Sequence, residues 1–226
     1  MVKFTFATEK EGFDEHINKS IRGYQDLWDD ILKFSKYFVE DGTTVIDIGC
    51  STGRLLKAMK SQNDEFAPGC VYRGIELEPE FFKDLVNEDN LEFVRTDIRE
   101  FDWARNAPNC SLVTSIFSLQ FLPKRDRQAV IDQVFRSLSK GGAFIFSEKV
   151  LGTDPQVEEM LTFCYYDWKR TNFTAEEILA KEQKLRSMMK PISYNEILSM
   201  VKAVGFNVVQ PFWQNFHFVG VMALKH

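Results

Sequence analysis

The amino-acid sequence predicts an α/β fold in which helices cover both faces of a doubly wound, mostly parallel sheet. Short apolar runs alternate with helical patterns along the 226 residues, as is typical of parallel sheets. In one stretch, Thr44 to Leu56, an apolar run leads directly into glycines and then into a helical pattern. A buried parallel strand that runs into a helix opens a domain of this kind.

The remaining elements follow from the same alternation. The first strand holds Val45, Ile46 and Ile48, and its helix begins near Thr52 or Gly53. Further strands are expected at 71–76, 91–95, 112–117 and 143–146, with a final hairpin at 206–209 and 216–224. Helices are expected from 55 to 59, after Pro79, at 126–138 and at 194–204. The sequence therefore predicts seven strands.

Two segments lie outside this alternation. Residues 1–40 precede the first strand and contain an amphipathic helix from Ile21 to Phe38. Residues 153–190 form a mostly helical insertion before the last helix. Because no linker or repeat interrupts the chain, we expect one domain over 1–226, with a core at 41–152 and 191–226, an N-terminal helical cap at 1–40 and a helical cap insertion at 153–190.

Composition excludes several classes of protein. The net charge is −5 and no basic block stands out, which argues against a nucleic-acid partner. The four cysteines contain no C-x-x-C pair, and with three histidines they give no metal-ligand spacing, so a reducing, cytoplasmic compartment is expected. No signal peptide and no apolar run near 20 residues is present, so no membrane partner is expected. We expect a small-molecule substrate and leave a homodimer open.

The glycine turn after the first strand indicates the type of ligand. A dinucleotide fingerprint needs glycines at its first, third and sixth positions, where this chain has Gly49, Ser51 and Arg54. The spacing that fits is Asp47-x-Gly49-x-Ser51-x-Gly53. An acid before the first glycine favours a ligand with an ammonium group over a pyrophosphate. Taken alone, the turn is equally consistent with a tight strand-to-helix corner that binds nothing.

Carboxylates follow three successive strands of the predicted sheet. Asp47 ends the first strand, Glu76 ends the second and Asp97 follows the third. In a doubly wound sheet, ligands bind beyond the carboxyl ends of the strands. There Glu76 can accept both hydroxyls of a ribose, Asp97 can accept from an adenine amino group, and Ile98 can pack on the base. The set favours adenosine without phosphates, because phosphates would repel the carboxylates.

The spacing from Asp47 to Gly53 resembles motif I of the class I S-adenosylmethionine-dependent methyltransferases, with Ser51 in place of the middle glycine. Further segments are similar to those of the carboxy-S-adenosylmethionine synthases, namely 18–24, 117–122, 146–149, 168–172 and 213–218. That family carboxylates the methyl group of its cofactor with prephenate. The resemblance implies a Rossmann-like fold with a terminal antiparallel hairpin, and S-adenosyl-L-methionine as cofactor. The cofactor contacts expected from the motif and the resemblance are Tyr24, Asp47, Gly49, Cys50, Ser51, Gly53, Glu76, Leu77, Asp97, Ile98 and Ile116.

Two positions depart from the family's pattern. Ile116 stands where the family has an asparagine in the fourth strand. An ungapped comparison places Glu182 where the family has the arginine that holds the carboxylate, although a slip of one helical turn would bring Arg186 there. A carboxylate in place of a guanidinium reverses the sign of the interaction. We therefore expect no carboxy-S-adenosylmethionine synthesis from this chain.

The insertion supplies the candidate catalytic residues Tyr165, Tyr166 and Arg170. Aromatic faces can stabilise a sulfonium, and Arg170 can hold a carboxylate of the acceptor or of the cofactor. The alternative is a cap helix whose aromatic residues are simply buried.

Three functions remain open. The first is an S-adenosylmethionine-dependent transferase that methylates a small molecule by in-line displacement. The second is an enzyme that rearranges the cofactor itself, either by carboxylation or by cyclisation to azetidine-2-carboxylate with release of methylthioadenosine. The third is a non-catalytic cofactor sensor.

Overall fold

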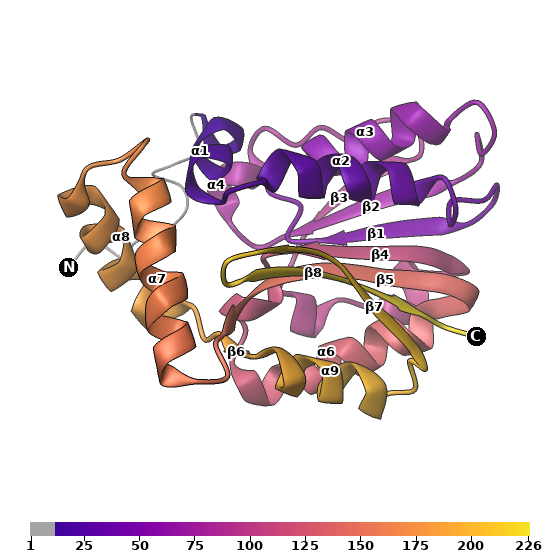
Figure 1. The fold of residues 1–226 in the computed structure, drawn as a ribbon. Coiled ribbons are helices and arrows are strands. Elements are labelled where there is room, and N and C mark those ends of the chain that lie inside the picture. Colours follow the sequence, from indigo (N-terminus) through magenta and orange to yellow (C-terminus); the bar gives the residue numbers. More distant parts are fainter. Residues whose placement is uncertain (1–11) are drawn as a thin grey trace.

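The computed structural model describes residues 12–226 and shows one central sheet between two layers of helices (Figure 1). The strand order is β3-β2-β1-β4-β5-β8-β7. The bounds are β1 Thr44–Ile48, β2 Val71–Glu76, β3 Leu91–Arg95, β4 Cys110–Ile116, β5 Leu138–Leu151, β7 Val208–Asn215 and β8 Phe218–Leu224. All pairs among β1 to β5 are parallel, whereas β8 is antiparallel to both β5 and β7. The predicted fold class, with its terminal antiparallel hairpin, is confirmed.

Helices cover both faces of the sheet. One layer contains α2 (Tyr24–Ser35) and α3 (Arg54–Asn63), and the other contains α6 (Lys124–Ser137) and α9 (Tyr194–Ala203) (Figure 1). Successive strand side chains point to opposite faces. In β5, Ile145 accordingly belongs to the core beneath α2 and α3, and Phe144 belongs to the core beneath α6 and α9. The short elements are α4 (Pro79–Phe82), η2 (Ile98–Glu100), α5 (Trp103–Asn106), η3 (Leu119–Phe121) and β6 (Ile192–Ser193).

The two expected caps lie beside the carboxyl ends of the parallel strands. They consist of α1 (Phe13–Ser20) from the N-terminal segment and of α7 (Pro155–Lys169) and α8 (Ala175–Met188) from the insertion (Figure 1). Local capping chemistry sets the helix starts. Asp154, which precedes Pro155, accepts from the backbone N–H groups of Gln156 and Val157 at the start of α7. Thr174 forms a capping box with Glu177 at the start of α8. None of the helices in the described part of the chain has the length and apolar character to cross a membrane.

The expected single helix from Ile21 to Phe38 is wrong in its bounds. The chain turns at residues 21–23, where Gly23 has φ 73°, and α2 begins only at Tyr24. Helix α3 also runs further than expected, to Asn63, whose buried amide donates to Ser35 Oγ at 3.0 Å. The extension of α3 reflects this contact with α2, and at the break a Cβ on Gly23 would lie 3.1 Å from Asn215 Nδ2 of β7. Both differences therefore involve packing between distant segments, which the local apolar period does not report.

Gly53 shows why a helix can start so close to the sheet. It precedes α3 with φ 70°, and a Cβ placed on it would lie 2.8 Å from Phe93 Cζ. The left-handed backbone and the close approach both require glycine. Gly53 does not line the cavity described below, so it packs α3 against β3, although the motif suggested a cofactor contact.

Gly53→Ala should therefore destabilise the protein more than Gly42→Ala. Gly42 has φ 71°, and a Cβ placed on it would have no atom within 4 Å, so alanine there adds backbone strain alone, about 1–2 kcal/mol. At Gly53 the clash with Phe93 should add about 1–3 kcal/mol. Urea unfolding of both variants measures the difference, and equal losses would contradict this account.

Candidate active site

A cavity of about 530 Å³ lies at the carboxyl ends of the parallel strands, beneath α1, α7 and α8. Its size falls within the range of about 300–1,000 Å³ that is usual for small-molecule sites. Parts of the core and of both caps contribute to its wall. Of the predicted site residues, Tyr24, Asp47, Gly49, Cys50, Ser51, Glu76, Leu77, Asp97, Ile98, Ile116 and Tyr165 line it.

The turn after β1 forms the floor of the cavity. The amides of Gly49 and Cys50 both donate to the carbonyl of Ile75, at 2.8 and 3.1 Å, and so hold the turn against the end of β2. Gly49 has φ 71°, and a Cβ on it would lie 2.3 Å from Ser118 Oγ. Glycine at this position therefore allows the loop after β4 to meet the loop after β1.

Glu76 joins the ends of β1 and β2 through its side chain. Its two carboxylate oxygens accept from the amides of Ser51 and Glu78, each at 2.8 Å. Burial raises the pKa of Glu76, and these backbone donors oppose the shift. A carboxylate oxygen can accept more than one hydrogen bond. The carboxylate is therefore fixed in place and can still accept from a ligand in the cavity.

Asp47 is the most deeply buried carboxylate of the cavity wall, with 3% of its surface exposed. Its pKa is raised to about 7, chiefly by burial. A hydrogen bond of 2.8 Å from Thr114 Oγ1 opposes the shift, and the charge of the nearby Glu76 adds to it. A cation bound beside this pair of acids would offset the cost of burying their charge. The site thus suits a ligand that carries an ammonium group.

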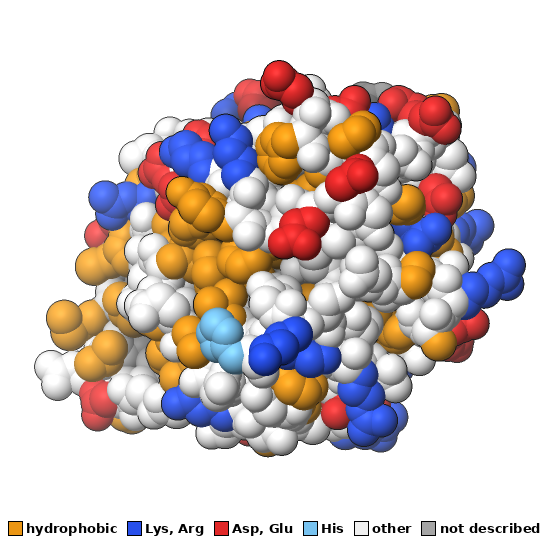
Figure 2. Space-filling model, turned by 90° about the vertical axis from the view of Figure 1, so that its right-hand side faces the viewer, with side chains coloured by type: hydrophobic (Ala, Val, Ile, Leu, Met, Phe, Trp, Pro, Cys, Tyr) orange, Lys and Arg blue, Asp and Glu red, His pale blue; other side chains and the backbone are white. Residues whose placement is uncertain are grey.

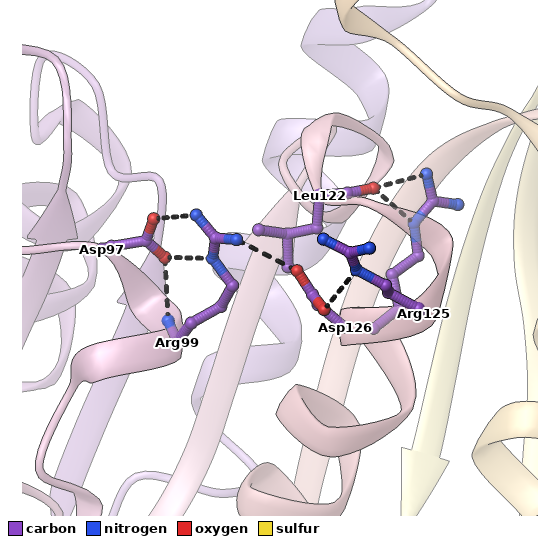
Figure 3. Close-up of polar contacts among 6 residues, drawn as sticks. Asp97, Arg99, Leu122, Arg125 and Asp126 are labelled. Carbon is purple, nitrogen blue, oxygen red and sulfur yellow. Dashed lines mark hydrogen bonds and ion pairs between the residues drawn. The ribbon is translucent and has the colours of Figure 1, made fainter.

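Asp97, which the sequence predicts as an acceptor for an adenine amino group, is engaged by a neighbouring guanidinium. Arg99 donates to both of its oxygens, with Nη2–Oδ2 at 2.6 Å and Nε–Oδ1 at 3.0 Å (Figure 3). A further hydrogen bond of 3.0 Å joins Arg99 Nη1 to Asp126 Oδ2 (Figure 3). The guanidinium holds the pKa of Asp97 below its ordinary value. Asp97 is therefore a partner of Arg99, which also lines the cavity and which the strand-end argument missed.

Tyr166 and Arg170 do not line the cavity, contrary to the expected pocket wall. Arg170 is exposed and pairs with Asp167 at 3.4 Å. The reason is helical geometry. Tyr165 and Lys169, four residues apart in α7, share the face toward the cavity, whereas Tyr166 and Arg170 are turned by about 100° from it.

Three charged residues of the cavity wall complete the site. Lys149 and Glu182 form an ion pair of 3.7 Å, and each side chain is 16% exposed. Lys169 is 3% exposed, and its ammonium lies 5.2 Å from the centre of the Tyr165 ring. Lys149 and Lys169 were part of segments that carried the resemblance, but no role was assigned to them. The spacing of four residues from Tyr165 to Lys169 is the sequence signal that would have identified Lys169 as a cavity residue.

The two caps are joined across the cavity. The Tyr165 hydroxyl donates to the carbonyl of Ser20 at 2.7 Å, which links α7 to the end of α1. Tyr24 is buried, and its ring lies 6.3 Å from that of Phe117, which has φ 54° at the end of β4. Tyr24 of α2 and Tyr165 of α7 thus both contribute aromatic side chains to the cavity wall.

The shifted pKa of Asp47 predicts how stability depends on pH. The carboxyl of an unfolded aspartate has a pKa of about 3.9, so between about pH 4 and pH 7 the folded protein binds more protons at Asp47 than the unfolded chain. The free energy of unfolding of the ligand-free protein therefore falls as pH rises through this window.

Asp47→Asn retains an acceptor for Thr114 but does not titrate. The difference in unfolding free energy, variant minus wild type, should rise between pH 4 and pH 7 by up to about 1.4 kcal/mol per pH unit. Urea unfolding at several pH values measures this difference. A difference that stays constant across the window would show that Asp47 is ionised in the fold at every pH tested.

Comparison with known proteins identifies the family. A family model described as "Methyltransferase domain" matches residues 45–142. A carboxy-S-adenosyl-L-methionine synthase of Staphylococcus epidermidis is 34% identical over 99% of this chain and 97% of that protein. A protein of the same name from Shewanella oneidensis is 29% identical over 98% of this chain and 93% of its own length.

The structural comparison supports the fold. Human N-acetylserotonin methyltransferase in complex with S-adenosylmethionine matches 97% of this chain and 56% of its own, with a TM-score of 0.60 at 14% identity. The predicted fold, cofactor and transferase class are thus confirmed. The chain belongs to the carboxy-S-adenosyl-L-methionine synthase family, among the S-adenosylmethionine-dependent transferases that share the class I methyltransferase fold.

Proposed function

We propose that this enzyme transfers the methyl group of S-adenosylmethionine to a small molecule that carries an O–H or N–H nucleophile. The observation that carries the proposal is the ion pair of Lys149 with Glu182 in the cavity wall. At this position the resemblance leads one to expect an arginine that binds a carboxyl group. Glu182 stands there instead, and its carboxylate pairs with the ammonium of Lys149. A wall without that guanidinium suits methyl transfer better than carboxylation.

The cavity floor fits the cofactor. Glu76 is positioned by two backbone donors and can accept from ribose hydroxyls, and Asp47 suits the ammonium of the methionine part. Ile98 is 8% exposed and offers an apolar surface for the base. The contacts that we assign to the cofactor are Tyr24, Asp47, Gly49, Cys50, Ser51, Glu76, Leu77, Ile98 and Ile116. When bound, the cofactor supplies an electrophilic methyl group on a sulfonium.

The cap residues position the reactants and exclude water. The hydrogen bond from Tyr165 to Ser20 holds α7 against α1 above the cavity. The Tyr165 ring offers a π-face that favours a cation. Methyl transfer by in-line displacement depends largely on such positioning and on a water-poor site. No covalent intermediate on the chain is required.

Rearrangement of the cofactor is the second candidate. The match to the carboxy-S-adenosyl-L-methionine synthases extends over 99% of this chain, so it includes both caps and not only the cofactor-binding core. A site closed over one molecule would suit carboxylation of the cofactor, or its cyclisation with release of methylthioadenosine.

Product analysis separates these reactions. The enzyme is incubated with S-adenosylmethionine alone, with prephenate, and with fractions of a small-molecule extract, and all products are identified by mass. We expect S-adenosylhomocysteine and a methylated compound from an acceptor fraction, and no carboxylated cofactor from prephenate. Glu182→Arg is the matched variant, because it restores a guanidinium beside the cavity.

Two other products of the wild-type enzyme would favour the second candidate, and one product of the variant would identify the role of Glu182. Carboxylated cofactor from the wild type would show that another cation, such as Lys169 or Arg186, takes the role of the family's arginine. Methylthioadenosine from the cofactor alone would identify cyclisation. Carboxylated cofactor from Glu182→Arg only would show that Glu182 by itself separates this enzyme from its relatives.

Glu76→Ala should weaken the binding of S-adenosylhomocysteine by about 1.5–3 kcal/mol, the range for a hydrogen bond to a charged group. Glu92→Ala on the neighbouring strand β3 is the control, because Glu92 pairs with Arg73 outside the cavity. Calorimetry measures both affinities. Tight binding of NAD by the wild type, or equal affinities of the two variants, would contradict the assigned contact.

The surface and the cysteines support a small-molecule substrate in a reducing compartment. On the face shown in Figure 2, which is the right-hand side of Figure 1, Lys and Arg side chains are dispersed among acidic and apolar ones. This face is the one away from the cavity (Figure 1). The net charge of −5 argues against a nucleic-acid substrate. Cys164 is exposed and unpaired, which suits the cytoplasm.

A further inference from the structure

Lys169 is an unusual residue for the interior of a protein. It ends α7, lines the cavity and is 3% exposed. Lysine is almost never fully buried unless it is paired. Among the described residues, its ammonium has no carboxylate within ion-pair distance and no hydrogen-bond acceptor, and it lies 5.2 Å and 5.8 Å from the ring centres of Tyr165 and Phe173.

Burial is the main influence on the charge state of Lys169. It lowers the pKa, the Glu182 carboxylate of α8 opposes the shift, and Lys181 of α8 and Lys149 of β5 add to it, so that the pKa lies at about 8. Glu182 is itself engaged by Lys149 at 3.7 Å, so its effect on Lys169 is shared. From α1, His16 lines the same cavity. A sulfonium bound in this cavity adds another positive charge, which disfavours the ammonium again.

We propose that Lys169 is the general base of the transfer reaction, an inference that rests on the proposed methyl transfer. The neutral Nζ accepts the proton of the acceptor's O–H or N–H group while the acceptor atom bonds to the methyl carbon. The bond from sulfur to that carbon breaks, and its electron pair remains on sulfur. The ammonium of Lys169 returns the proton to solvent after the methylated product leaves, so no further reactant is needed.

Two roles of Lys169, general base and binding group for a substrate anion, can be told apart by substitution. An anchor requires a positive charge, which arginine also provides, whereas a base requires a lone pair near neutral pH, which arginine does not offer. Lys169→Arg and Lys169→Met should therefore both fail as bases. The arginine variant alone would retain activity if Lys169 only held an anion.

The first experiment needs no acceptor. NMR of protein with ¹³C,¹⁵N-labelled lysine, assigned with Lys169→Met, follows the titration of Lys169 in complexes with S-adenosylhomocysteine and with S-adenosylmethionine. We expect a pKa well below that of the surface lysines, and a lower value with S-adenosylmethionine because of its sulfonium. A Lys169 signal that titrates with the surface lysines overturns the inference.

The second experiment uses the acceptor that the product analysis identifies. Lys169→Arg and Lys169→Met should lose at least about 100-fold in kcat, the scale of general base catalysis. Their affinity for S-adenosylhomocysteine should stay within about threefold, and the rise of kcat with pH should disappear. Lys202→Arg, on the exposed side of α9, controls for the substitution itself.

Chemical rescue decides between catalysis and structure. Lys169→Ala leaves room beside Tyr165, so added methylamine or ethylamine should restore turnover in proportion to the concentration of the free amine. Full activity of Lys169→Arg, or an inactive Lys169→Ala that binds S-adenosylhomocysteine but is not rescued, overturns the base while methyl transfer stands. If the wild type methylates no fraction, the proposed function fails and the inference with it.

Discussion

The site depends on the hydrogen bonds that tie the turn after β1 to the end of β2. The amides of Gly49 and Cys50 converge on the carbonyl of Ile75, and the carboxylate of Glu76 accepts from Ser51. These bonds satisfy backbone donors of the turn that would otherwise be unpaired. They also hold one carboxylate rigidly at the cavity floor. A change in this turn would therefore disturb the fold and the cofactor site together.

Burial determines the chemistry of the cavity. The fold removes Asp47, Glu76 and Lys169 from water, and in each case desolvation is the largest cause of the pKa shift. The carboxyl pKa values rise and the ammonium pKa falls, so all three groups move toward neutrality. A ligand that brings a cation to the acids offsets part of this cost. The sulfonium of the same ligand would add a positive charge near the lysine, which favours the neutral amine that a base requires.

The caps belong to the site because both ends of the insertion are fastened to the core. At its far end, the amide of Lys190 donates to the carbonyl of Gln120, and the buried guanidinium of Arg127 donates to the carbonyl of Lys190. At its near end, Glu158 accepts from the amide of Gly152. Between these points the link from Tyr165 to Ser20 crosses to the N-terminal cap. Segments 145 positions apart in the chain are thereby held over one cavity.

The sequence by itself determined the parallel core and the position of two acids at the cavity floor. Strands at 71–76 and 91–95 have the predicted bounds, because apolar composition and strand periodicity are local properties. Glu76 and Asp47 were found because the carboxyl ends of parallel strands share one edge of the sheet. The tertiary structure alone decided the break at Gly23, the pairing of Asp97 with Arg99, and the face of α7 that meets the cavity. The face of α7 depends on how that helix packs against the core, and Arg99, which is only two residues from Asp97, is oriented by a second hydrogen bond to Asp126 of α6. Charge partners and burial, which set the pKa of Lys169, exist only once β5, α7 and α8 are assembled around it.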